Sequence, residues 1–121
     1  EDEYGDYTTA TAKVHLVVKD EVVIGEEAFK GSKNLWKVTA THASDVGYQA
    51  FMGCENLIEA ILPDANSVED GSFRGCYNLT NVRLPNATSI GCEEWYAAFH
   101  SCDALRHITL HPNVNIAKGS F

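Results

Sequence analysis

The hydrophobic residues of this chain recur with one period, and a phenylalanine preceded by Ala or Ser marks each copy. The five positions are Phe29, Phe51, Phe73, Phe99 and Phe121. The steps between them are 51−29 = 22, 73−51 = 22, 99−73 = 26 and 121−99 = 22 residues. A period in the twenties is typical of a solenoid, in which each unit buries its apolar face only against its neighbours. The pattern therefore predicts a repeat array with one continuous core.

A strand pattern follows each of the first four phenylalanines. Six residues beyond each Phe begins the motif L-x-x-Φ-x-Φ, where Φ is apolar, with its leucines at Leu35, Leu57, Leu79 and Leu105. Alternation at its last positions turns the apolar side chains inward and their neighbours outward. Leu16 and Val18 hold equivalent places before Phe29, so five parallel strands are expected.

The segment between strands carries turn signals. A second apolar column, meaning equivalent positions of successive repeats, precedes the phenylalanines at Ile24, Val46, Val68, Ile90 and Ile116. Pro63 and Pro85 should end two strands, because proline lacks the backbone donor. Glycines placed to end one helical turn in the left-handed conformation follow at Gly31, Gly53 and Gly75. Each repeat is therefore predicted to consist of a strand, a turn, a short helical turn and a segment that returns the chain to the next strand.

Two stretches carry a family resemblance: Ala50-Phe51-x-Gly53-Cys54-x-Asn56-Leu57 and Ser72-Phe73-x-Gly75-Cys76-x-Asn78-Leu79, continuing into Leu62-Pro63 and Leu84-Pro85. They resemble the BspA-like leucine-rich repeats of bacterial and protist cell surfaces. The resemblance implies an α/β fold, a curved right-handed solenoid with parallel strands on its concave side and short helical turns on its convex side. It also implies extracellular adhesion or ligand capture, with no cofactor and no catalytic residues.

The chain divides into an acidic N-terminal tail, residues 1–13, and a solenoid of about five short repeats, residues 14–121. The tail lacks apolar periodicity and is expected to be solvated. Because Phe121 is a core position with no capping sequence after it, the C-terminus is expected to be uncapped. We expect either a fragment of a longer array or, as the second choice, an end-to-end homo-oligomer.

The net charge of −8 disfavours nucleic acid and anionic membrane surfaces as partners, because both attract basic proteins. No stretch approaches 18 consecutive apolar residues, so no membrane-spanning helix is expected.

Three cysteines share one column, Cys54, Cys76 and Cys102. Since stacked column positions face inward, we expect buried thiols that pack as small hydrophobes; disulfides between neighbouring repeats are the alternative. Burial raises a thiol pKa, which disfavours a cysteine nucleophile.

A metal site is also disfavoured. His107 and His111 lie about 13 Å apart along an extended strand, whereas zinc–nitrogen bonds are about 2 Å long. The triplets beginning at Asn78 and Asn86 match the N-glycosylation pattern and are treated as chance matches.

The outward strand positions are the candidate binding surface. They form three columns: His15/Lys37/Glu59/Asn81/His107, Val17/Thr39/Ile61/Arg83/Thr109 and Lys19/Thr41/Pro63/Pro85/His111. These fifteen positions hold one of the 17 acidic residues and three of the nine Lys and Arg residues. A neutral to slightly basic strip is therefore predicted on an acidic chain, although polar residues are also expected on any half-exposed sheet.

The candidate partner-binding residues lie on this strip, with one exception. Lys37, Arg83 and His107 would supply donors and Ile61 an apolar contact, with Glu59, Asn81 and Thr109 beside them. Tyr96 is added from the four extra residues between Gly91 and Phe99, which are predicted to lengthen a helical turn and to place Trp95 in the core.

These features favour a non-enzymatic binding or adhesion module of a secreted or cell-surface protein. Its concave face would recognise a protein or an anionic glycan. The alternative is a structural spacer or assembly unit with no ligand of its own.

Overall fold

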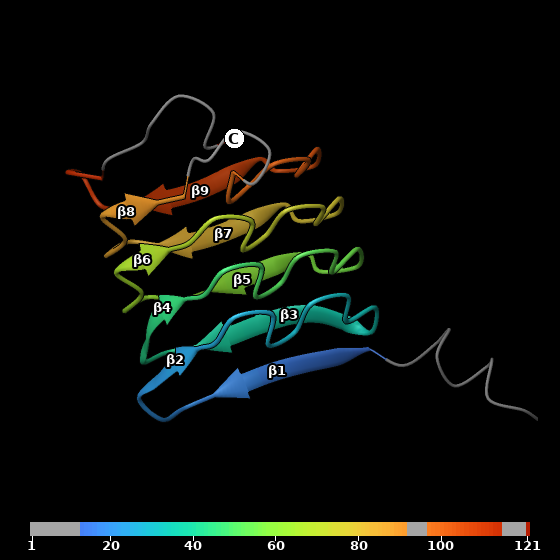
Figure 1. Cartoon of the computed structure of the whole chain (residues 1–121), viewed down its shortest axis with the longest axis horizontal. Helices are drawn as coiled ribbons and strands as arrows, with labels where there is room; N and C mark the ends of the chain where they lie inside the picture. The colour runs from blue at the N-terminus through green and yellow to red at the C-terminus, as the bar shows by residue number, and fades with distance from the viewer. Residues whose placement is uncertain (1–12, 92–96, 115–120) are drawn as a thin grey trace, which may run out of the picture.

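The computed structural model describes residues 13–91, 97–114 and 121, and two parallel sheets run through them. The five-stranded sheet has the order β1 (Val14–Val18), β3 (Leu35–Ala40), β5 (Glu59–Ile61), β7 (Asn81–Leu84), β9 (His107–Leu110). The four-stranded sheet has the order β2 (Val22–Ile24), β4 (Ala43–Val46), β6 (Ser67–Val68), β8 (Ser89–Ile90). Figure 1 shows the circuits of the chain stacked in sequence order, so the molecule is a parallel β-solenoid of about four circuits, here called rungs.

The five parallel strands are confirmed, and the helical turns are wrong. No described residue is helical, and the expected α/β class gives way to two facing sheets joined by turns. The column that includes Ile24, Val46, Val68 and Ile90 ends the strands of the four-stranded sheet and is buried. Ile116 lies outside the described residues. These strands are two to four residues long, too short for alternation to reveal them.

Hydrogen bonding between rungs explains why the turns are not helical. The amide of Phe29 donates to the Ala50 carbonyl of the next rung at 2.8 Å. The neighbouring amide of Lys30 donates instead to the Glu27 carbonyl, three residues back, at 3.2 Å. Because neighbouring amides alternate between the next rung and their own, a run of helical i to i−4 bonds cannot form.

The left-handed glycines are confirmed. Gly31, Gly53 and Gly75 have φ of 74°, 74° and 76°, and Ser101 adopts 62° at the equivalent place. Glycine suits this column because it has no Cβ to oppose positive φ.

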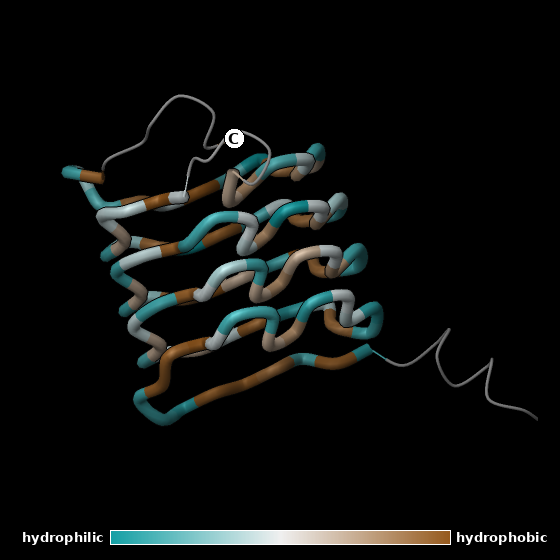
Figure 2. The backbone as a smooth tube through the Cα atoms, in the orientation of Figure 1, coloured by the Kyte–Doolittle hydropathy of each residue, from teal (hydrophilic) through white to brown (hydrophobic). Residues whose placement is uncertain are grey.

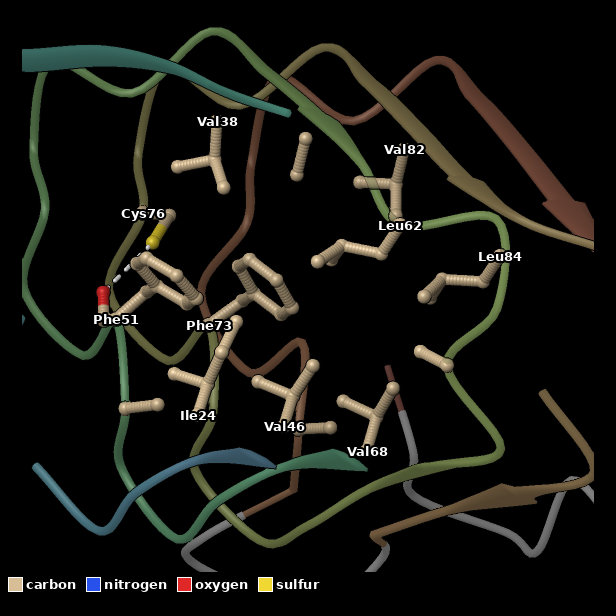
Figure 3. Close-up of a cluster of buried hydrophobic side chains, with 14 of the residues drawn as sticks. Ile24, Val38, Val46, Phe51, Leu62, Val68, Phe73, Cys76, Val82 and Leu84 are labelled. Carbon is tan, nitrogen blue, oxygen red and sulfur yellow. Dashed lines mark hydrogen bonds between the residues drawn. The ribbon is translucent and has the colours of Figure 1, made fainter. Parts of the chain in front are cut away.

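A ladder of phenylalanine rings runs through the core. Successive ring centroids lie 5.2–5.4 Å apart, with ring planes within 10° of parallel, from Phe29 to Phe121. Such offset stacking adds about 0.5–1.5 kcal/mol per pair beyond the burial of area. Figure 3 shows the rings of Phe51 and Phe73 between side chains of the two sheets. Those labelled are Val38, Leu62, Val82 and Leu84 on one side and Ile24, Val46 and Val68 on the other.

The four extra residues of the fourth repeat leave the ladder unchanged. In the second rung the Ala50 amide donates to the Gly47 carbonyl at 3.1 Å. In the fourth, the Ala98 amide donates to the equivalent Gly91 carbonyl at 3.0 Å, across a longer segment. The predictions for Trp95 and Tyr96 fall outside the described residues.

The ladder makes a prediction for stability. Phe73→Ala should lower the free energy of unfolding by about 3–5 kcal/mol, because it removes a fully buried ring stacked on both faces. Tyr77→Ala is the control, since its aromatic side chain is 49% exposed, and should change that energy by less than about 0.5 kcal/mol. Urea unfolding followed by circular dichroism measures both. Equal unfolding midpoints in the two variants would contradict the ladder.

Candidate functional site

The outward side chains of the five-stranded sheet, here called the strand face, form the columns that the sequence predicts. The strand register aligns His15, Lys37, Glu59, Asn81 and His107 in one row across the sheet. It aligns Val17, Thr39, Ile61, Arg83 and Thr109 in the next. The third predicted column begins just beyond the strands, because β7 ends immediately before Pro85 and β5 ends two residues before Pro63.

A further column was missed. Backbone hydrogen bonds of 2.8–3.0 Å link Trp36, Ile58, Thr80 and Arg106 in successive rungs. Between β1 and β3 the register passes from Val14↔Leu35 to His15↔Lys37, so Trp36 is the extra residue of a bulge. The signal in the sequence was the pair of positions between the leucine and the next apolar residue, which simple alternation does not accommodate.

The centre of the strand face holds a neutralised cluster. Lys37 Nζ lies 3.1 Å from Glu59 Oε1, and Asn81 Nδ2 donates to Glu59 Oε2 at 2.7 Å. The hydrogen bond from Lys37 is the largest influence that holds the pKa of Glu59 below its usual range, and Asn81 and the charge of Arg83 act the same way. Partial desolvation opposes them. Glu59 therefore stays ionised and cancels most of the charge of Lys37.

Arg83 is different. Its side chain is exposed and forms no ion pair with another described residue. It lies between Ile61 and Thr109 in its column, beside the Glu59 cluster. Of the two cationic candidates, Lys37 and Arg83, only Arg83 keeps its donors available.

An aromatic corner adjoins this cluster at the first two strands. The rings of His15 and Trp36 meet edge to face, with centroids 6.4 Å apart and planes at 62°. Lys13 Nζ lies 6.0 Å from the Trp36 ring centroid, and the side chain of Ile58, in the next rung, is 42% exposed. Apolar and cationic groups thus lie together on one rigid face.

Comparison with known proteins is decisive for the family. The sequence matches the BspA type leucine rich repeat region, in six copies, over residues 15–121. The chain belongs to the BspA-type leucine-rich repeat family. Solenoids of this family are typically non-catalytic and serve as interaction or repeat modules, commonly in surface or secreted proteins. No curated protein and no solved structure matches the chain.

In this BspA-type solenoid the three column cysteines are free thiols. Each Sγ donates to the carbonyl of the phenylalanine in the preceding rung, at 3.2 Å for Cys54 and 3.1 Å for Cys76 and Cys102. Figure 3 draws the bond from Cys76 to Phe51. Burial raises the pKa of Cys54 to about 11 and that of Cys102 to about 12, and raises that of Cys76 further. Cys54 and Cys76 are buried as predicted and Cys102 is partly buried, whereas the hydrogen bonds that they donate were not predicted. All three are too weakly acidic for nucleophilic chemistry.

The described residues offer neither a metal site nor a membrane-spanning helix. None of their His, Cys, Asp and Glu side chains gather in threes at a spacing that would hold a metal. No described helix has the length and apolar character to cross a membrane. Both glycosylation triplets begin at an exposed asparagine, Asn78 or Asn86. Asn78 uses its amide nitrogen to donate to the Glu55 carbonyl at 2.7 Å.

The buried thiols predict slow alkylation. Cys54, Cys76 and Cys102 should remain unmodified by iodoacetamide in the folded protein at neutral pH, because burial suppresses the thiolate. All three should react in concentrated urea. Mass spectrometry of peptides resolves each cysteine. Rapid labelling of Cys76 before unfolding would contradict the burial of this column.

The Glu59 cluster predicts a pH-dependent contribution to stability. A carboxyl whose pKa is lowered on folding stabilises above its unfolded pKa, and this contribution is lost as pH falls through the lowered folded value. Glu59→Gln should lower the free energy of unfolding at pH 7 by up to about 1 kcal/mol, since the paired side chains are about a quarter exposed. The deficit should shrink progressively once the pH falls below the ordinary pKa of a glutamate side chain, about 4.3.

Glu55→Gln is the matched control, because the Lys33–Glu55 pair is much more exposed. It should change stability little at any pH. Urea unfolding across the acid range measures both variants. A Glu59→Gln deficit that stays constant with pH would mean that the lost stability does not come from ionisation of Glu59.

Proposed function

We propose that this chain is a non-enzymatic protein-binding module that captures an acidic partner on its strand face. Arg83 carries the proposal, because it is an exposed cation without an ion-pair partner among the described residues. Guanidinium groups bind carboxylates through two parallel hydrogen bonds, so Arg83 suits an acidic side chain of a partner.

The surroundings of Arg83 support binding rather than simple solvation. The Lys37–Glu59–Asn81 cluster beside it has little net charge, so it neither attracts nor repels an anion strongly. Trp36 and Ile58 add partly exposed apolar surface on the same face. Aromatic and arginine side chains are the residues that most often dominate binding energy at interfaces.

The charge distribution of the chain and the rigidity of the strand face also support binding of an acidic partner. The whole chain has a net charge of −8, yet Glu59 is the one acidic residue among the fifteen outward strand positions. The strand face is held by parallel backbone ladders, so little order is lost when a partner binds. An acidic partner would thus avoid the rest of the surface and find a preorganised site. Exposure of this face in a secreted or cell-surface protein completes the proposal.

A structural spacer remains the second candidate. The observation that favours it is the cluster itself, in which Lys37, Glu59 and Asn81 bond to one another rather than remaining available to a partner. A spacer would need only the stacked rungs and no accessible donors.

Binding to a panel separates these two functions. Extracellular-matrix proteins, plasma proteins and anionic glycans would be immobilised, and capture of the chain compared with capture of its Arg83→Glu variant. Loss of a charge-assisted contact, with repulsion added, should weaken binding by about 10- to 100-fold. Lys30→Glu is the control, because it makes the same charge change on a turn away from the strand face.

Equal binding by the chain and by Arg83→Glu would remove the strand face as the site. Capture by anionic glycans alone would keep the site and replace the acidic protein by a glycan. If the chain binds none of the immobilised ligands, the structural spacer would be favoured.

A further inference from the structure

The two N-glycosylation triplets lie in different structural settings. The first, which begins at Asn78, uses both of its polar side chains within the fold. Asn78 Nδ2 donates to the Glu55 carbonyl at 2.7 Å, and Thr80 Oγ1 donates to the Ile58 carbonyl at 3.2 Å. Asn56 makes the same kind of bond to the rung before it, at 2.8 Å. The repeat therefore explains Asn78 as a donor that links neighbouring rungs.

The second triplet, Asn86-Ala87-Thr88, leaves both of its polar side chains unused. Asn86 and Thr88 are exposed, and neither side chain has a hydrogen-bond partner among the described residues. The side chain of Ala87, between them, is fully buried. The asparagine and the hydroxyl residue are the two side chains that define the glycosylation motif. This triplet therefore presents both of them to solvent and is held to the core by its middle residue.

The repeat gives no structural reason for an asparagine at position 86. The equivalent residues of the two preceding rungs are His42 and Asp64, which pair with each other at 2.9 Å. The strand register places Pro112 at the equivalent position of the next rung, and its side chain carries no polar group. Asn86 is therefore not part of an inter-rung ladder like the one that includes Asn78.

The backbone places Asn86 at an exposed turn. The Ala87 amide donates to the Leu84 carbonyl at 3.1 Å, which closes a β-turn with Pro85 and Asn86 at its two central positions. This turn is the corner at which the chain leaves β7 and approaches β8. Figure 2 shows hydrophilic residues at the corners on this side of the array, at the left of the view.

An open hollow lies beside this turn. It has a volume of about 530 Å³ and is lined in part by Asn86 and by the polar side chains of His42, Ser44, Asp64 and Asn66. These side chains include both donors and acceptors, which sugar hydroxyls need as partners. Space and hydrogen-bonding groups are therefore present for the first sugars of a glycan attached at Asn86.

We propose that Asn86 is an N-glycosylation site and that Asn78 is a structural asparagine. In the transfer, Asn86 Nδ2 attacks the anomeric carbon of a lipid-pyrophosphate-linked oligosaccharide. The new N–C bond forms as the C–O bond to the pyrophosphate breaks. The lipid pyrophosphate leaves with the electron pair, and a base of the transferase takes the proton that Nδ2 loses. The proposal requires passage through a secretory pathway and does not depend on binding at Arg83.

Secretion of the full chain from cultured eukaryotic cells, behind a secretion signal, tests this site. Enzymatic deglycosylation converts a glycosylated asparagine to aspartate, so mass spectrometry of peptides measures the occupancy of each triplet. Asn86 should be occupied several-fold more than Asn78. Thr88→Ala should abolish modification of Asn86, because it removes the motif and keeps the acceptor. Thr80→Ala is the matched control in the other triplet and should leave Asn86 modified.

The stability of the chain without a glycan separates an acceptor from a structural asparagine. Asn78→Gln should lower the urea unfolding midpoint, because it disturbs the bond to the Glu55 carbonyl. Asn86→Gln should leave the midpoint unchanged, since its side chain is exposed and without a partner among the described residues. An unmodified Asn86 in the secreted chain would overturn the proposal. So would equal occupancy of the two triplets, or a midpoint lowered as much by Asn86→Gln as by Asn78→Gln.

Discussion

Parallel stacking of the phenylalanine rings is the constraint on which the rest of this solenoid depends. Neighbouring strands in a sheet lie about 4.8 Å apart, and rings offset by 5.2–5.4 Å between centroids match that spacing closely. Each rung must then place an equivalent side chain above the one before it. Inward columns consequently accept a narrow range of sizes, as the column of Cys54, Cys76 and Cys102 shows. The turns follow the same spacing, because alternate backbone amides donate to carbonyls of the next rung instead of forming helical hydrogen bonds.

The same spacing determines the chemistry of the strand face. Side chains of equivalent positions are held one strand apart, so complementary groups in one column meet without further help. Lys37, Glu59 and Asn81 satisfy each other in this way. Arg83 stands in a column with Ile61 and Thr109, which offer no anion, and so remains available. Repetition thus separates Lys37, Glu59 and Asn81, which bond to one another, from Arg83, which stays exposed and without an ion pair among the described residues.

The sequence periodicity predicted the structural features that recur in every rung and missed those that depend on contacts between rungs or occur in one rung alone. The five strands, the outward rows, the left-handed glycines and the buried thiols all follow from residues that repeat at a fixed step. The helical turns were wrong because their amides bond to a rung about 22 residues away, which no local pattern reports. The strands of the second sheet are too short to show alternation, and the bulge at Trp36 adds a column that simple alternation does not predict. Tyr96 lies outside the described residues and remains a prediction.

The bond between Ala98 and Gly91 carries a consequence for how such arrays can change. This hydrogen bond closes the corner of the fourth rung at nearly the same distance as the bond between Ala50 and Gly47 in the second rung, although the segment that it spans is longer. The segment between donor and acceptor can therefore vary in length without opening the corner. Foreign peptide inserted after Gly47 would be held at both ends by a frame that is already assembled. The fold therefore contains its own grafting position, where new loops can be displayed along a rigid scaffold at intervals of one rung.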